Sequence, residues 1–107
     1  MNNFIEVNED NFNQEVINSE IPVLVEFGAD WCVPCKRMEP LLQKFHDDHF
    51  GKMRLAHINV DQAADLTMKF QVQSIPTLIL FVSGEPRQAA TGLQSSDRLK
   101  ENFSHLI

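Results

Sequence analysis

The sequence has only two cysteines, no apolar run longer than five residues, and fewer basic than acidic side chains. Two cysteines are too few for the disulfide framework of a small secreted protein. The longest apolar run, Leu78–Val82, falls far short of the ~20 residues that a membrane helix needs. Nine basic residues against fifteen acidic ones give a formal net charge of −6, which argues against a nucleic-acid binder with a basic face. No basic start followed by a long apolar run is visible, so we expect a cytoplasmic protein without membrane contact.

The 107 residues fit a single domain, residues 1–107, because no repeat, low-complexity stretch or linker interrupts them. Apolar spacing alternates between the patterns of strands and helices. We expect strands at 4–7, 23–27, 55–60, 77–82 and around 88–91, the last after a turn at Gly84-Glu85-Pro86. Helices are expected after a cap at Asn8 or Asp10, over about 32–49, over 63–70, and after a cap at Ser95 or Ser96. The order βαβαβαββα predicts an α/β protein with a central mixed sheet, antiparallel at the final hairpin, and helices on both faces.

Cys32 and Cys35 follow the end of the 23–27 strand and open the long helix. The unpaired N–H groups and the partial positive charge of a helix N-terminus stabilise a thiolate. We expect Cys32 at the cap position, with its sulfur near those N–H groups and partly exposed. Pro34 suits the first turn, where its missing N–H would be unpaired anyway. Because Cys35 lies one turn further on, it can attack a disulfide formed by Cys32.

The segment Val23–Lys36, with the motif Trp31-Cys32-Val33-Pro34-Cys35, resembles the active-site region of the thioredoxin family. The resemblance covers essentially the whole chain, and it implies a thioredoxin fold and a protein-disulfide reductase. Further matches are Pro40 at the family's helix kink, Asn59-Val60-Asp61 after the third strand, Ile75-Pro76-Thr77 at the cis-proline loop, and Gly84 and Gly92 at two glycine positions.

The resemblance also implies a mechanism. The Cys32 thiolate attacks a protein disulfide to form a mixed disulfide, and Cys35 then displaces the reduced product and leaves Cys32–Cys35 oxidised. Glu26, an unusual residue within an apolar strand, is the candidate general acid/base that takes the Cys35 proton through water. Burial would raise its pKa. The alternative from the pattern alone is that Glu26 lies on a solvated edge.

Pro76 is the second predicted feature of the site. In the family the matching peptide bond is cis and its loop lies beside the cysteines, so the backbone of Ile75 is expected to pair with an extended substrate segment. A trans proline that merely starts a strand is the alternative. A tryptophan is more often a core residue, but one next to the nucleophile is a reasonable docking residue. The expected substrate-binding rim consists of Trp31, Val33, Pro34, Ile75, Pro76, Gly92 and Leu93.

The sequence departs from the family pattern at several site positions. Val33 replaces the usual glycine between the cysteines, which leaves the reduction potential open. Gly28 stands where a tryptophan is usual, and Glu26 stands where an aspartate is usual. His57 occupies a position where lysine is common, and we hypothesise that it forms a coupled, protonation-dependent pair with Glu26. An ordinary strand histidine bonded to backbone or water is the alternative.

Cys32, Cys35, His46 and His49 superficially match the ligand spacing of a zinc finger. If residues 35–46 form one helix, however, its two ends lie ~16 Å apart, too far to share a zinc ion. We therefore expect no metal site, and His46 and His49 are interpreted as residues near a helix C-terminus.

The sequence predicts a monomeric disulfide reductase that holds no cofactor of its own, because it lacks a glycine-rich nucleotide-binding motif. The redox centre is the reversible Cys32–Cys35 disulfide. The resemblance implies two kinds of partner: disulfide-containing client proteins, and a thioredoxin reductase that draws electrons from a nicotinamide cofactor or ferredoxin. Two alternatives stay open, a disulfide oxidase or isomerase and a non-redox binding module on the same fold.

Overall fold

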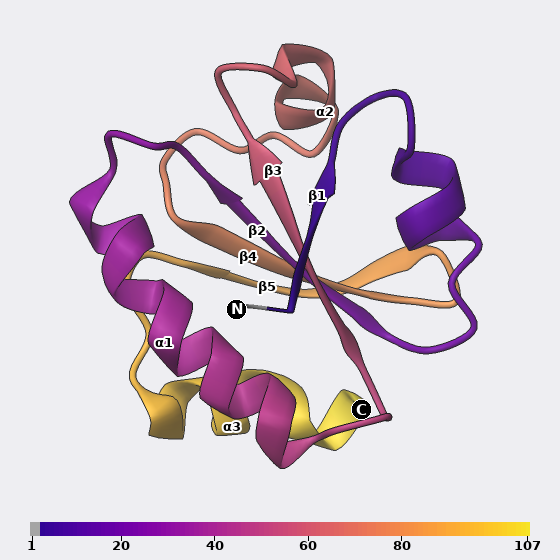
Figure 1. Ribbon diagram of the computed structural model, residues 1–107, viewed down its shortest axis with the longest axis vertical. Coiled ribbons are helices and arrows are strands. Elements are labelled where there is room, and N and C mark those ends of the chain that lie inside the picture. The colour runs from indigo at the N-terminus through magenta and orange to yellow at the C-terminus, as the bar shows by residue number, and fades with distance from the viewer. Residues whose placement is uncertain (1–2) are drawn as a thin grey trace.

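The computed structural model describes residues 3–107, which form a five-stranded sheet of order β1-β3-β2-β4-β5 with helices on both faces (Figure 1). None of the helices in this described range is long and apolar enough to cross a membrane. The elements are β1 (Phe4–Val7), η1 (Asn13–Ile17), β2 (Val23–Gly28), α1 (Val33–Asp48), β3 (Arg54–Asn59), α2 (Ala64–Lys69), β4 (Thr77–Val82), β5 (Glu85–Thr91), α3 (Ser96–Phe103) and η2 (Ser104–Leu106).

The sheet is mixed, as the order of elements predicts. β1 and β2 each pair with β3 in parallel, because a helix-containing connection returns the chain to the same end of the sheet. β4 runs antiparallel to β2, and β5 runs antiparallel to β4 after a tight turn at Ser83 and Gly84. Both turn residues have positive φ, at 54° and 81°. The predicted α/β architecture and the predicted hairpin are therefore confirmed.

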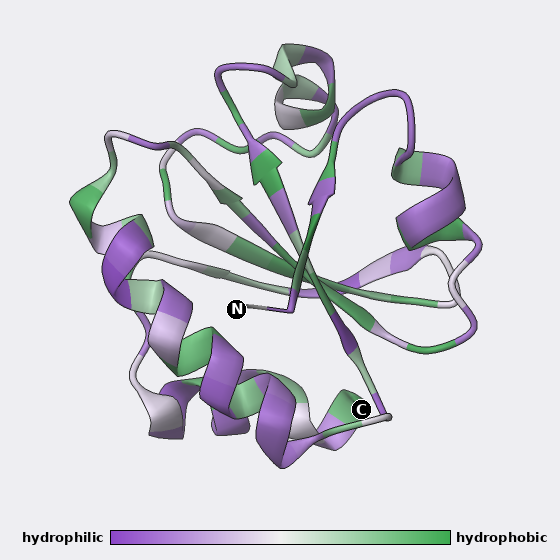
Figure 2. Ribbon diagram, viewed as in Figure 1, coloured by the Kyte–Doolittle hydropathy of each residue, from purple (hydrophilic) through white to green (hydrophobic). Residues whose placement is uncertain are grey.

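Alternating side chains of the strands feed two separate halves of the core. Along β2, Val23, Val25 and Phe27 face η1 and α2. Leu24 faces the opposite way, toward α1 and α3, where the side chains of Leu42 and Phe103 are completely buried. Apolar residues accordingly concentrate along the central strands, while α1 alternates apolar and polar residues along its length (Figure 2). The same alternation places Glu26, two residues after Leu24, on the α1 face.

Two predicted boundaries differ from the structure. The first helix is only a short π-helix, and no side chain caps it. Asn8 instead accepts a hydrogen bond from the Asp10 amide at 2.8 Å, a local turn that competes with capping. The last strand begins at Glu85 and includes Pro86, which the sequence places in the turn. An edge strand tolerates this proline because one side of its backbone needs no ladder partner, and the register shifts there.

Candidate active site

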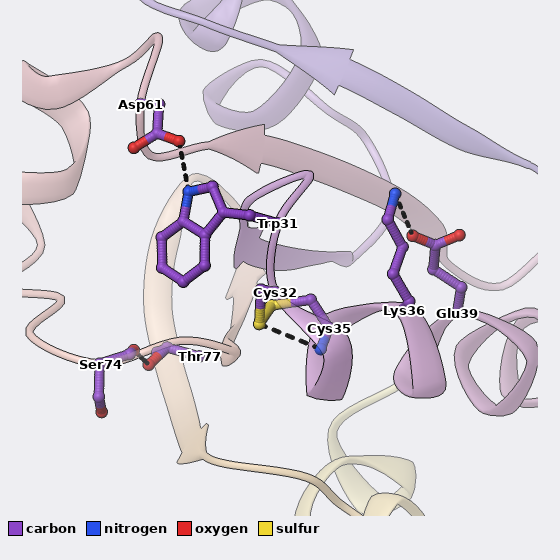
Figure 3. The surroundings of a disulfide bond; sticks show 8 residues. All are labelled: Trp31, Cys32, Cys35, Lys36, Glu39, Asp61, Ser74 and Thr77. Atoms are coloured by element: carbon purple, nitrogen blue, oxygen red, sulfur yellow. Dashed lines mark hydrogen bonds and ion pairs between the residues drawn. A yellow bond between two sulfur atoms is a disulfide. The ribbon is translucent and has the colours of Figure 1, made fainter.

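Cys32 is the N-cap residue of α1, and Cys35 lies one turn further along the helix (Figure 3). The two sulfurs are joined in a disulfide, with their Cα atoms 5.2 Å apart. The backbone N–H of Cys35 also donates a hydrogen bond to Cys32 Sγ at 3.2 Å. Pro34 falls in the first turn, where no helical partner is available for an N–H. The Cys32 sulfur therefore lies among the free amides and at the positive end of the helix dipole, as predicted.

Cys32 is less exposed than the sequence predicts. Cys32 retains 4% of its surface exposed and Cys35 only 2%, and both pack against Ala29. Ile75 packs on the pair from the loop before β4, while Trp31 lies on the side of Asp61 (Figure 3). The oxidised pair is thus largely enclosed, and Cys32 is the more exposed of the two.

The predicted rim residues differ in exposure. Trp31 and Val33 are 68% and 61% exposed and Leu93 is also exposed, whereas Pro76 is buried. The indole N–H of Trp31 donates to Asp61 at 2.8 Å, which fixes the ring beside the cysteines. The Ile75–Pro76 peptide bond is cis. The N–H of Gly92 donates a hydrogen bond to the Pro76 carbonyl at 2.8 Å, which connects these two predicted rim residues.

Glu26 lies inside the protein rather than on a solvated edge. It is 1% exposed, and within residues 3–107 neither carboxyl oxygen has a hydrogen-bond partner. Burial is the main cause that raises the pKa of Glu26 to about 8, and the negative charges of Glu39 and Glu6 act in the same direction. The Lys36 ammonium lowers it in part. At neutral pH this carboxyl group is mostly protonated and can donate a proton.

His57 lies next to Glu26 in the sheet, but its hydrogen bond goes elsewhere. Glu6, His57 and Glu26 occupy matching positions on β1, β3 and β2. The Nδ1 atom of His57 lies 2.6 and 3.1 Å from the two carboxylate oxygens of Glu6. The sequence did not point to Glu6, because only the parallel pairing of β1 with β3 brings it to His57. Asp61 was missed as a site residue for a similar reason, since its contact with Trp31 spans thirty residues.

The zinc-finger spacing corresponds to no metal site. α1 is continuous from Val33 to Asp48, so Cys35 and His46 lie at opposite ends of one helix. Across residues 3–107, no cluster of three or more His, Cys, Asp or Glu side chains could hold a metal ion. His49 instead bonds the Phe45 carbonyl and the Ser104 hydroxyl group, and thereby ties α1 to the C-terminal turn.

A disulfide between two cysteines one helical turn apart, with Cys32 at the N-cap of a helix, is the redox centre of a dithiol–disulfide oxidoreductase. The family model for thioredoxin matches residues 3–105. The chain belongs to the thioredoxin family and is a protein-disulfide oxidoreductase.

Curated relatives agree with this membership. The chain is 39% identical to a thioredoxin of Alicyclobacillus acidocaldarius, over 88% of this chain and 90% of that one. It is 35% identical to a thioredoxin of Rickettsia bellii, over 94% and 96% of the two chains. It is also 36% identical to a bifunctional thioredoxin reductase/thioredoxin of Mycobacterium leprae, over 96% of this chain and 22% of that longer protein.

Proposed function

We propose that this protein reduces disulfides in client proteins, with Cys32 as the nucleophile and Cys35 as the resolving thiol. The observation that carries the proposal is the position of the Cys32 sulfur at the N-cap of α1, where it accepts the Cys35 N–H. In the reduced protein the same amides stabilise the Cys32 thiolate, which attacks the client disulfide. Cys35 then attacks Cys32, releases the reduced client and restores the disulfide.

The exposed rim is the proposed client-binding surface. Trp31, Val33 and Pro34 offer exposed apolar area next to Cys32, and Gly92 is partly exposed. Pro76 is itself buried, and its carbonyl oxygen accepts the Gly92 N–H. Thr77 donates to the Ser74 carbonyl at 2.6 Å and so closes the loop that presents Ile75 to the site. An extended client segment that pairs with the Ile75 backbone gains affinity from main-chain hydrogen bonds without demanding a particular sequence.

Glu26 is proposed as the buried general acid/base of the resolving step, acting through water. Its enclosure supports this role, because a carboxyl group that is neutral near pH 7 can deliver a proton to a departing thiolate. The adjacent strand position of His57 supports a protonation-dependent coupling between the two side chains.

The proposed partners are a thioredoxin reductase and disulfide-containing clients. The fusion of a thioredoxin reductase with a thioredoxin in the Mycobacterium leprae relative supports the first of these. We propose that residues 1–107 act as one domain, as a monomer in the cytoplasm, without a bound cofactor, nucleic acid or membrane. The remaining alternatives are an oxidase or isomerase and a non-redox binding module, and the enclosed redox pair favours chemistry over binding alone.

Insulin disulfide reduction driven by dithiothreitol tests the proposal. Cys32→Ser should abolish turnover, because no thiolate then lies at the helix N-terminus. Cys35→Ser should also stop turnover but accumulate mixed disulfides with clients, visible by non-reducing electrophoresis. The two variants control for each other, since each removes one sulfur from the same buried pair. Turnover that survives Cys32→Ser would refute the assigned nucleophile.

A further inference from the structure

His57 lies near the cysteines and can act as a base, a role that the proposed mechanism does not assign to it. Glu26 is mostly protonated at neutral pH, so in most molecules it is available as an acid and not as a base when Cys35 must lose its proton. An imidazole remains a competent base at that pH. His57 is the imidazole in reach: alternation along β3 puts it on the α1 face with Leu55, the same face that carries Glu26 and Cys35.

The hydrogen bond to Glu6 determines which nitrogen of His57 is free. A carboxylate has no proton to donate, so the Nδ1 atom of His57 donates its own proton across the 2.6 Å contact with Glu6. In the neutral ring, Nε2 then carries the lone pair and accepts a proton. Glu6 thus holds the ring in one tautomer and stabilises the imidazolium that forms, the role of the acid in an Asp–His–Ser triad.

The absence of a side chain at Gly28 lets His57 and Cys35 approach the same point of β2. A Cβ atom at position 28 would lie 3.1 Å from Cys35 Sγ and 3.4 Å from His57 Nε2. The nitrogen and the sulfur are therefore separated by no more than about 6.5 Å, a distance short enough for proton transfer through one bridging water molecule. A glycine within a strand weakens it and often marks such a close approach. The missing side chain at Gly28 is thus what connects the imidazole to the thiol.

We propose that His57 is the proton acceptor for Cys35, that Glu6 is the residue that positions it, and that Gly28, which lacks a side chain, allows His57 and Cys35 to approach each other. This inference rests on the proposed function and divides its acid–base work between two groups. His57 takes the proton, and the neutral Glu26 carboxyl group supplies one to the departing sulfur.

The step balances as follows. The Cys35 S–H proton passes to His57 Nε2, directly or through the intervening water. The resulting thiolate attacks Cys32 Sγ, the new Cys32–Cys35 bond forms, and the bond from Cys32 to the client sulfur breaks. The electron pair leaves on the client thiolate, which takes its proton from Glu26. The cysteine pair is oxidised by two electrons and the client disulfide is reduced by two.

The titratable groups around His57 are mostly acidic. Glu6 faces it from β1 and Glu26 from β2, while Asp30, Lys36 and Glu39 line the same cavity of about 180 Å³ from the end of β2 and from α1. Among the described residues 3–107, Lys36 is the one basic side chain besides His57 that lines this cavity, beside the carboxyl groups of Glu6, Glu26, Asp30 and Glu39. The His57 side chain is 15% exposed, whereas the Glu6 side chain that bonds it is 70% exposed.

Ellman's reagent separates the two thiol reactions in a stopped-flow experiment with the reduced protein. One thionitrobenzoate is released when Cys32 attacks, and a second when Cys35 resolves the mixed disulfide. At pH 7, His57→Gln should leave the rate of the first phase within about twofold of wild type and lower the rate of the second phase roughly tenfold or more. It should also remove the rise in the second rate across the histidine range of pH. The matched control is His105→Gln, an exposed histidine remote in sequence, which should change neither phase.

Gly28→Ala provides an independent test, because it removes no titratable group. The added methyl lies between Nε2 and Sγ and should slow the second phase as His57→Gln does. In a double variant that already carries His57→Gln, Gly28→Ala should cause no further slowing of the second phase. Equal slowing by Gly28→Ala in both backgrounds would mean a steric effect on Cys35 alone and would overturn the relay. For Glu6, the conservative Gln should preserve more of the rate than Ala, since an amide oxygen still accepts the Nδ1 proton.

The tautomer of His57 can be measured in the wild-type protein, so this test does not depend on the folding of a variant. Nitrogen-15 NMR of the imidazole should show the Nδ1–H tautomer of His57, with Nε2 unprotonated at high pH. An Nε2–H tautomer would overturn the inference. Failure of this inference is distinguishable from failure of the proposed function. If the wild type reduces insulin and His57→Gln leaves the second phase unchanged, only the role of His57 is refuted. A wild-type protein without insulin reduction refutes the function itself.

Discussion

Glu26 is a carboxylic acid in a site that offers it no hydrogen bond from the described protein residues 3–107. Its neighbours along β2 are apolar, and the strand is buried at every position. Transfer of an ionised carboxylate into such surroundings is unfavourable, and this raises the pKa of Glu26 from 4.5 to about 8. Because the folded protein keeps this carboxyl group protonated at pH values where the unfolded chain ionises it, Glu26 lowers the stability of the fold above pH 4.5.

The cost should be visible as a dependence of stability on pH. Between pH 4.5 and pH 8 the unfolded chain loses the Glu26 proton while the folded protein keeps it, so this group lowers the free energy of unfolding as pH rises. Below pH 4.5 it has no effect. Glu26→Gln should remove this contribution to the pH dependence of stability. Between pH 5 and pH 8 the free energy of unfolding of the wild type should therefore fall by ~3 kcal/mol relative to that of the variant.

Urea unfolding of the oxidised protein at several pH values measures this difference. Glu20→Gln is the matched control, because Glu20 is exposed and its removal should leave the wild-type pH dependence unchanged. Parallel curves for wild type and Glu26→Gln would contradict a raised pKa.

Among the elements, the helix N-termini carry the clearest local signals. The N-cap residue of α1 is Cys32, which belongs to the redox pair, whereas the N-cap residue of α3 is Ser95, which stabilises the helix. The Ser95 hydroxyl oxygen accepts the Arg98 N–H at 3.2 Å, which decides between the two serines that the sequence leaves open. The α3 helix matters for the site only indirectly, because Leu99 and Phe103 press against α1 from the opposite side of their shared core.

Ser95→Ala should lower the free energy of unfolding by ~1 kcal/mol, because the Arg98 amide loses its partner. Thermal or urea unfolding gives the value, and Ser96→Ala serves as the neighbouring control without a capping role. Insulin reduction at a temperature well below unfolding should stay at the wild-type rate. A loss of activity without a loss of stability would mean that α3 contributes to client binding.

At the scale of the whole molecule, the protein presents one redox pair and no further cysteine. No third thiol in this sequence can resolve a trapped client in place of Cys35 or transfer the oxidation to another site. The direction of the reaction is then set by the reduction potential of this single pair. Val33, whose side chain is 61% exposed between the cysteines, is the departure from the family pattern that bears most directly on it.

We expect a reductant. In a glutathione buffer poised at about −210 mV, a pair near the thioredoxin value of about −270 mV is almost entirely disulfide, whereas an oxidase near −120 mV is almost entirely dithiol. Alkylation of free thiols followed by mass spectrometry measures the two fractions. A predominantly dithiol pair in this buffer would assign the protein to the oxidase alternative. Val33→Gly reports how much the departure from the family pattern contributes.

Local chemistry determined much of this protein before any tertiary contact is considered. The alternation of apolar runs and helical spacing specifies the strands, the helices and the mixed sheet, because connections between parallel strands need a crossover. The Cys32–Cys35 spacing at a strand–helix junction specifies the reactive pair. Errors fell where local signals compete: Asn8 forms a turn rather than a cap, and Pro86 joins an edge strand rather than the turn.

Only the tertiary structure decided which side chains meet at the site. Glu6 and His57 lie fifty-one residues apart, and the parallel register of β1 on β3 alone brings them to 2.6 Å. The low exposure of the cysteines, the burial of Glu26 and the close approach of Cys35 to Gly28 likewise depend on the packing of α1 against the sheet. Two cysteines spaced three apart can form a disulfide by themselves, because one helical turn is enough to join them. The proton partners that we propose, Glu26 and His57, lie with Glu6 on three different strands, and no local pattern encodes a distance between strands.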